Sequence, residues 1–146
     1  MEQCYDNLSL DYMISFPLYA CARETIKRYN ACLSEIDLTY TQYIAMVVLW
    51  EKGPVSVKEL GEELFLDSGT LTPLLKKMEA KGLLTRRRST EDERILIVSL
   101  TDKGQELREK ALEIAPKMVR ELKLSLEEGR ELWRLLNKFL LTFRQN

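Results

Sequence analysis

Apolar and polar positions recur along this chain mostly with the period of helices. Residues 9–33 carry the first such pattern, in which Pro17 fits either in the first helical turn or at a kink. Thr39 and Gln42 form a capping box that begins a second helix, and Gly53-Pro54 ends it. We expect its apolar stripe at Tyr43, Ile44, Val47 and Val48.

A short helix, a tight turn and a second amphipathic helix are predicted over residues 56–81. Ser56 and Glu59 form another capping box, which begins a helix that reaches about residue 64. Asp67 and Ser68 cap the next helix, and Gly82 ends it. Pro73 falls in the tolerated first turn only if this helix begins near residue 70. The apolar side of this helix follows a helical spacing, with Leu71, Leu74, Leu75 and Met78.

Two alternating stretches, residues 84–89 and 94–100, predict a β-hairpin with residues 89–93 at its tip. Thr101-Asp102 then caps a long helix that carries Leu107, Ala111, Ile114 and Met118, and Ser125 with Glu128 caps the last helix. The predicted fold class is therefore mainly α with a small β-hairpin, in the order α-α-α-α-β-β-α-α of a winged helix-turn-helix.

We expect residues 1–146 to form one domain, in which residues 39–101 are the winged helix-turn-helix DNA-binding region. Residues 1–36 and 102–146 add large apolar side chains beyond what that core needs. We therefore expect them to be dimerisation helices. A two-fold dimer would present two recognition helices about one DNA turn apart, and so would bind a pseudo-palindromic operator.

Charge is distributed unevenly along the chain. The net charge is −1, yet residues 67–90 hold six basic residues against two acidic ones. Hydroxyls near a helix N-terminus can approach bases or phosphates, lysines attract phosphates, and a hairpin arginine can enter the minor groove. The predicted DNA-binding residues are Ser68, Thr70, Thr72, Lys76, Lys77, Arg86, Arg88, Asp92 and Arg94, where Asp92 would orient the Arg94 guanidinium.

Other function classes have little support in the composition. The sequence has no histidine, and its cysteines, Cys4, Cys21 and Cys32, are odd in number and lack metal-ligand spacing. We expect no metal site, no cofactor and no enzymatic reaction, and we expect Cys21 and Cys32 to be packed side chains. No apolar run approaches the roughly 20 residues that span a bilayer. With no secretory signal in the first residues, a cytoplasmic protein is expected.

The segment of residues 66–104 resembles the MarR family of winged-helix regulators, through Asp92–Arg94 and the Leu-Thr-x-x-Gly run at residues 100–104. Within that family, the segment around residues 15–30 is similar to the one-cysteine organic-hydroperoxide sensors of the OhrR type. The resemblance implies a reactive cysteine in the first helix, whose oxidation releases the operator. Tyr19, Tyr29 and Tyr40 match the tyrosines that surround that thiolate.

The position of the reactive cysteine is occupied by Ser15 in this sequence. A serine hydroxyl does not ionise near neutral pH and cannot be oxidised to a sulfenic acid. Two explanations are open: a cysteine-to-serine substitution at position 15 that keeps the protein in its reduced, DNA-binding form, or a natural relative without peroxide sensing. The leading hypothesis is a homodimeric transcriptional repressor of this sensor type.

Two other functions compete with that hypothesis. A MarR-type regulator could instead respond to a small aromatic effector, held by an aromatic pocket whose candidates are Tyr19, Tyr29, Tyr40, Tyr43 and Trp50. Alternatively, the chain could be a protein-interaction module that has lost DNA binding and uses its acidic helices for contact. An enzyme is the weakest alternative, because no histidine, metal cluster or reactive thiol is in place to carry a reaction.

Overall fold

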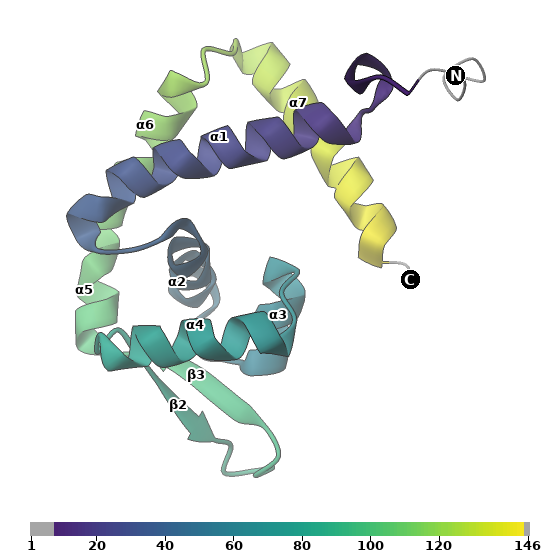
Figure 1. Cartoon of the computed structure of the whole chain (residues 1–146). Helices are drawn as coiled ribbons and strands as arrows, with labels where there is room; N and C mark the ends of the chain where they lie inside the picture. Colours follow the sequence, from purple (N-terminus) through teal and green to yellow (C-terminus); the bar gives the residue numbers. More distant parts are fainter. Residues whose placement is uncertain (1–7, 145–146) are drawn as a thin grey trace. The chain divides into compact units, whose positions relative to one another are not determined.

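The structure is a computed structural model of the chain, and it describes residues 8–144 (Figure 1). Its helices are α1 (Ser15–Leu33), α2 (Tyr40–Lys52), α3 (Val57–Leu64), α4 (Ser68–Ala80), α5 (Asp102–Ala111), α6 (Ile114–Glu121) and α7 (Leu126–Leu141). The strands are β1 (Val55–Ser56), β2 (Leu84–Arg88) and β3 (Leu96–Leu100), and short 3-10 turns cover Leu10–Tyr12, Ser34–Ile36 and Thr142–Arg144. The chain forms two compact units, with the boundary between Leu112 and Glu113.

The helix starts that were predicted from capping residues are confirmed by the caps themselves. Capping boxes are present at Thr39, Ser56 and Ser125, and the Asp67 carboxylate accepts from the Thr70 amide at 2.7 Å. These caps satisfy backbone N–H groups that have no partner within the helix. Because a cap involves residues only three apart, it is visible in the sequence.

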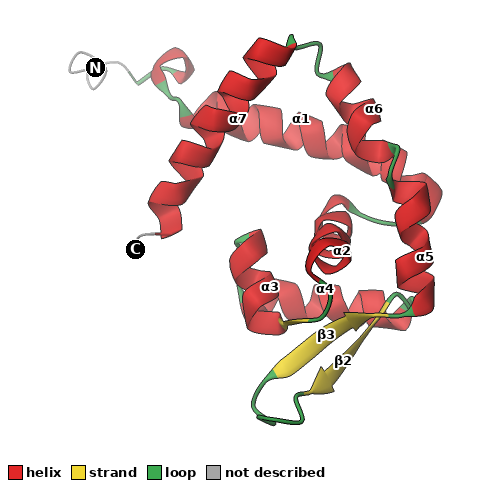
Figure 2. Ribbon diagram, turned by 180° about the vertical axis from the view of Figure 1, so that it is seen from behind, coloured by secondary structure: helices red, strands yellow, loops and turns green. Residues whose placement is uncertain are grey.

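The sheet is antiparallel, in the order β1-β3-β2. Figure 2 shows its two longer strands, β2 and β3, side by side. β2 pairs with β3 from Leu84↔Leu100 to Arg88↔Leu96, which forms the predicted hairpin, the wing. The sequence did not predict β1, because its two residues are too few for an alternating pattern. β1 pairs with β3 at Val55↔Val98 and so leaves β2 on an edge of the sheet.

The core of the first unit forms around α2, which lies between α1 and α4 (Figure 1). The predicted stripe of α2 is only partly correct: Tyr43 is buried, but Val47 is exposed, and Ile44 and Val48 are half-buried. Helix α2 is apolar on nearly every side, so periodicity alone does not choose the buried face. The residues that it does bury are Gln42, Tyr43, Ala45, Met46 and Leu49.

Three prolines lie at points where the observed helices can be compared with the expected ones. Helix α1 begins at Ser15 rather than near residue 9, which places Pro17 in its first turn. Pro73 lies inside α4 and not in its first turn, because the Asp67 cap starts that helix at Ser68. The predicted long helix after Thr101 is broken at residues 112–113, and this break places Pro116 in the first turn of α6, where its missing N–H costs no helical hydrogen bond.

The second unit contains α6 and α7, and its apolar side chains are largely uncovered within one chain. Helix α7 has no buried residue among those described. Its exposed large apolar residues are Leu126, Leu132, Trp133, Leu135, Leu136, Phe139, Leu140 and Leu141. An apolar surface of this extent is typical of a protein–protein interface.

Candidate nucleic-acid interface

The turn between α3 and α4 is three residues long and closely packed. Phe65 adopts a left-handed conformation (φ 54°), and the Leu66 amide donates to the Gly61 carbonyl at 2.9 Å. A Cβ at Gly61 would lie 2.8 Å from the Leu66 carbonyl oxygen, so this position accepts only glycine without a shift. The turn delivers the chain directly to the Asp67 cap of α4, which makes α3 and α4 a helix-turn-helix pair.

Helix α4 separates a buried face from a polar one, as predicted. Of its predicted apolar residues, Leu71, Leu75 and Met78 are buried and hold it against the core, and Leu74 is half-buried. The polar residues predicted to bind DNA lie on the remaining surface: Ser68, Thr70, Lys76 and Lys77 are exposed, and Thr72 is half-buried. Hydroxyls gather near the N-terminus of α4 and lysines farther along it, an arrangement that suits bases and phosphates respectively.

The tip of the wing carries an oriented arginine. The Asp92 carboxylate accepts from Arg94 Nε at 3.0 Å and from Nη2 at 2.9 Å, and it also accepts from the Arg94 amide at 3.0 Å. These hydrogen bonds hold the pKa of Asp92 below its ordinary value. The Arg94 side chain is nevertheless 90% exposed. The prediction that Asp92 orients Arg94 is therefore confirmed, and the guanidinium remains accessible to a ligand.

Two other arginines of the wing are engaged within the chain. Arg88 Nη1 donates across the tip to the carbonyls of Glu93 (3.2 Å) and Arg94 (3.5 Å). Arg86 is bound to Glu79 of α4, and its side chain is only 17% exposed. Arg87, between them on β2, is exposed. The structure thus leaves Arg94 and Arg87 more accessible than Arg86, which the sequence grouped with the DNA-binding residues.

The four residues expected to form a sensor pocket do not meet in one chain. Ser15 and Tyr19 lie one turn apart at the start of α1, whereas Tyr29 lies 14 residues farther along the same helix. At 1.5 Å per residue, Ser15 and Tyr29 are separated by about 21 Å. Tyr19 is exposed and is paired with Arg23, whose Nη1 donates to its hydroxyl at 3.2 Å.

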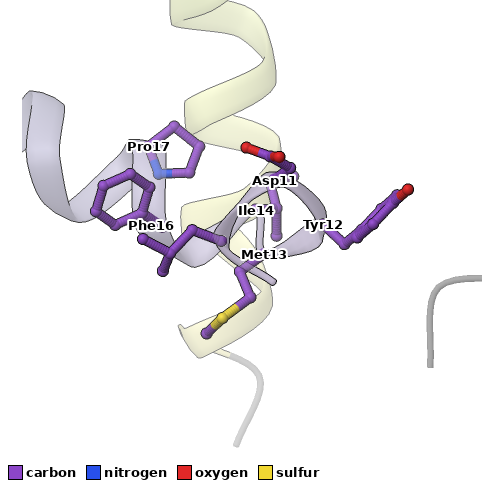
Figure 3. A pocket seen from close by; sticks show the side chains of 7 residues that line it. Asp11, Tyr12, Met13, Ile14, Phe16 and Pro17 are labelled. Carbon is purple, nitrogen blue, oxygen red and sulfur yellow. The ribbon is translucent and has the colours of Figure 1, made fainter. Parts of the chain in front are cut away.

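An apolar hollow flanks Ser15 at the start of α1. Figure 3 shows the side chains of Met13, Ile14, Phe16 and Pro17 around this helix start. The hollow is lined only by residues 10–14, 16 and 17, so it is local to one end of α1. Apolar surroundings of this kind suit the apolar part of a ligand or the apolar face of another helix better than they suit an ion.

Three tyrosines form a cluster at the other end of α1. The ring of Tyr29 lies 5.0 Å from that of Tyr40 and 6.0 Å from that of Tyr43, measured between centroids. Burial raises the pKa of Tyr29, and the neighbouring phenols and the Cys32 thiol raise it further. The Tyr40 amide donates to Asn30 Oδ1 at 2.7 Å, which fixes the first turn of α2 against α1.

The remaining aromatic and cysteine side chains lie apart from this cluster. Trp50 Nε1 donates to the Gly104 carbonyl at 2.9 Å and so ties α2 to α5. The five aromatic residues proposed for an effector pocket are therefore not assembled in one chain. Cys21, expected to be packed, is exposed on α1, and Cys32 is half-buried. Cys4 lies outside the described residues.

Within residues 8–144, no helix combines the length and the apolar character needed to cross a bilayer. The same residues contain no group of three or more cysteine, aspartate or glutamate side chains placed to hold a metal ion.

Comparison with known proteins agrees with this geometry. A family model described as transcriptional regulator SarA/Rot matches residues 27–111. The organic hydroperoxide resistance transcriptional regulator of Bacillus subtilis is 45% identical over 145 residues, 99% of each chain. A structure of reduced AbfR bound to DNA is 32% identical, covers 89% of this chain and 90% of that one, and superposes with a TM-score of 0.75. A mutant MarR from E. coli, complexed with operator DNA, has the same fold at 24% identity, with a TM-score of 0.84 and coverage of 92% and 99%. The chain therefore belongs to the SarA/Rot family of winged-helix, MarR-like transcriptional regulators.

Proposed function

We propose that this regulator is a homodimeric, cytoplasmic DNA-binding repressor of the organic-hydroperoxide-responsive type, in which Ser15 stands at the peroxide-reactive position. The observation that carries the DNA-binding part is the joint presentation of a polar α4 surface and an exposed, oriented Arg94. A helix of this kind fits the major groove, and the arginine suits the adjacent minor groove. The proposal assigns no enzymatic reaction to the chain.

Dimerisation is supported by the apolar surface that a single chain leaves open. Leu33 is the one buried residue of α1, and α7 buries none of its described residues. Trp133 is 69% exposed, and Phe139 is 45% exposed. We assign residues 1–36 and 102–146 to a two-fold interface, with residues 39–101 binding DNA. Two copies then recognise a pseudo-palindromic operator.

A two-fold dimer would also complete the sensor site. Within one chain, Ser15 and the Tyr29–Tyr40 pair lie at opposite ends of α1. If the α1 helices of two copies pack antiparallel about a two-fold axis, position 15 of one copy meets the tyrosine cluster of the other. Phenol hydroxyls could then donate hydrogen bonds to a thiolate at that position, as the resemblance to OhrR-type sensors implies.

The Ser15→Cys variant tests the sensor assignment. We expect the unmodified chain to stay bound to its operator when an organic hydroperoxide is added, because serine cannot form a sulfenic acid. The variant should release the operator under the same treatment, and fluorescence anisotropy of labelled DNA measures both. Exposed Cys21, present in both proteins, is the internal control for unspecific thiol oxidation. If the variant remains bound while mass spectrometry shows its new thiol oxidised, the sensor assignment is wrong.

A response to a small aromatic effector is the second candidate, and the observation in its favour is the Tyr29–Tyr40–Tyr43 cluster. Phenolic acids titrated into the operator complex decide between the two. Release of DNA by a phenolic acid, with no response of Ser15→Cys to peroxide, favours the effector. The opposite pair of results favours the peroxide sensor.

A further inference from the structure

A single carboxylate joins the recognition helix to the base of the wing. Glu79 Oε2 accepts from Arg86 Nη2 at 2.9 Å and from Nε at 3.2 Å, and Glu79 Oε1 accepts from the Arg86 backbone amide at 2.9 Å. The Arg86 side chain is 17% exposed and that of Glu79 is 37% exposed. Glu79 thus binds one residue of β2 through three charge-assisted hydrogen bonds, two of them from the planar guanidinium.

The position of this link in the sheet gives it a mechanical role. β2 is an edge strand, because the order β1-β3-β2 leaves one of its sides without a neighbouring strand. An edge strand presents backbone N–H groups that need partners. Glu79 satisfies one of them, at Arg86, from outside the sheet. The Glu79 carboxylate therefore accepts, at this one position, the hydrogen bond that a carbonyl of a fourth strand would accept, and it links α4 to the hairpin.

The geometry of the wing makes this base important for the tip. From Arg86 the hairpin continues for about four residues to its tip, through the last two residues of β2 and the start of the loop, or at most roughly 13 Å at 3.3 Å per residue. A tilt of about 20° at Arg86 would therefore move the tip by about 5 Å. The minor groove of B-DNA is about 6 Å wide. A small change of angle at the base of the wing would thus carry Arg94 out of the groove while α4 stays in place.

We propose that Glu79 is a positioning residue that fixes the angle between α4 and the wing, so that the major-groove and minor-groove contacts form together. This inference rests on the proposed DNA-binding function. Glu79 also neutralises Arg86 and keeps this guanidinium from binding phosphates indiscriminately. Glu79 hence raises the preference for the operator over random DNA, although it contacts neither DNA itself.

The Glu79→Gln substitution should change the affinity for two DNA ligands in opposite directions. We expect its affinity for an operator selected from random sequence to fall about tenfold, because the wing is no longer held. Affinity for a random duplex should rise two- to threefold, since Arg86 is freed to bind phosphate. The slope of log affinity against log salt should steepen by about one for the random duplex.

Glu91→Gln is the matched control, because Glu91 is an exposed carboxylate at the wing tip and the substitution removes the same charge. We expect it to raise the affinity for both duplexes alike.

A coupling measurement completes the test: Arg94→Ala should weaken operator binding at least threefold less in the Glu79→Gln background than in the unmodified chain. Arg86→Lys, which keeps the charge but loses the planar fork, provides a milder break if Glu79→Gln unfolds.

Residual dipolar couplings of the free protein test the inference without DNA. They should report one orientation of the β2–β3 hairpin relative to α4 in the unmodified chain and in Glu91→Gln, and a broadened orientation in Glu79→Gln. An unchanged orientation of the hairpin in Glu79→Gln overturns the inference, whether or not the chain binds DNA. A failure to bind DNA would separately refute the proposed function. Equal losses of operator and random-duplex affinity in Glu79→Gln, or an undiminished effect of Arg94→Ala, would also overturn it.

Discussion

Lys81 at the end of the recognition helix is bound to Asp37 at the junction of α1 and α2. Its ammonium group lies 3.1 Å from Asp37 Oδ2, donates to the Asp37 carbonyl at 2.5 Å, and approaches Gln42 Oε1 at 3.5 Å. Gln42 is the buried polar residue whose side chain also caps Thr39. Lys81, one of the six basic residues within residues 67–90, therefore fastens α4 to the segment next to the tyrosine cluster.

This attachment predicts different effects for two lysines of the same region. Lys81→Met should lower the free energy of unfolding by about 1 kcal/mol, because one ion pair and its hydrogen bonds are lost. It should leave the salt dependence of DNA binding nearly unchanged. Lys77→Met, at an exposed position, should reduce the slope against log salt by about one. Anisotropy titrations at several salt concentrations measure both variants. A reduced slope for Lys81→Met would place that ammonium on the phosphates instead.

Gly104 allows α5 to pack against the segment that precedes β2. A Cβ at this position would lie 2.0 Å from the Leu83 carbonyl oxygen, and the residue is buried. Gly104→Ala should therefore destabilise the fold by about 3 kcal/mol in urea unfolding, because backbone must move to relieve the overlap. Gly129→Ala is the control: in α7, a Cβ added at this position would meet nothing within 4 Å beyond the adjacent helix backbone, and it should stabilise by about 0.5 kcal/mol. Equal effects of the two substitutions would argue against the close packing at Gly104.

The Asp92–Arg94 pair predicts how the wing contributes to binding. Arg94→Ala should cost about 1–3 kcal/mol of operator affinity, and Asp92→Asn should cost less, since the guanidinium persists but loses its orientation. Arg87→Ala, on the exposed side of β2, serves as a charge-matched comparison. If Arg94→Ala leaves the operator affinity unchanged, and if that affinity does not vary with salt, the chain would be a protein-interaction module and not a DNA-binding one.

Stability at acid pH should depend on the capping carboxylates. Hydrogen bonds from the Ser56 backbone and side chain hold the pKa of Glu59 below its ordinary value of 4.5. A depressed pKa in the folded state contributes stability that is present above pH 4.5 and is lost as the pH falls through the folded-state pKa. Glu59→Gln should therefore destabilise the protein at pH 7 and flatten the loss of stability below pH 4.5. Urea unfolding at pH 7, 4 and 3 measures this, with Glu62→Gln on the same helix as the control. An unflattened acid limb would contradict the role of the cap.

Local signals predicted most of the fold. Each capping box or cap lies within four residues of sequence, and the glycines with positive φ, Gly53 and Gly82, lie where the sequence ends a helix. The wing and the Asp92–Arg94 pair were predicted on the same basis, since their partners are close in sequence. Helix α4 was predicted with its buried leucines, because only one of its faces is apolar.

Interactions between distant residues were not predictable from the sequence. Lys81 and Asp37 are 44 positions apart, and a lysine on a helix shows no sign of its partner. Arg86 looked like a DNA contact because it is one of three consecutive arginines, and only the packing of β2 on α4 brings it to Glu79. Pro116 could have indicated a break in the helix after Thr101. The apolar spacing continues across it, however, and so predicted one long helix.

Selection of binding sites from a random duplex library tests the central claim most directly. If two copies of the chain each place α4 in a major groove and Arg94 in the neighbouring minor groove, the enriched sequences should be inverted repeats. Their half-site centres should lie about 10 base pairs apart, and sedimentation should find two chains on each duplex. Enrichment of no sequence, or binding of a single chain to a half-site without symmetry, would contradict the account.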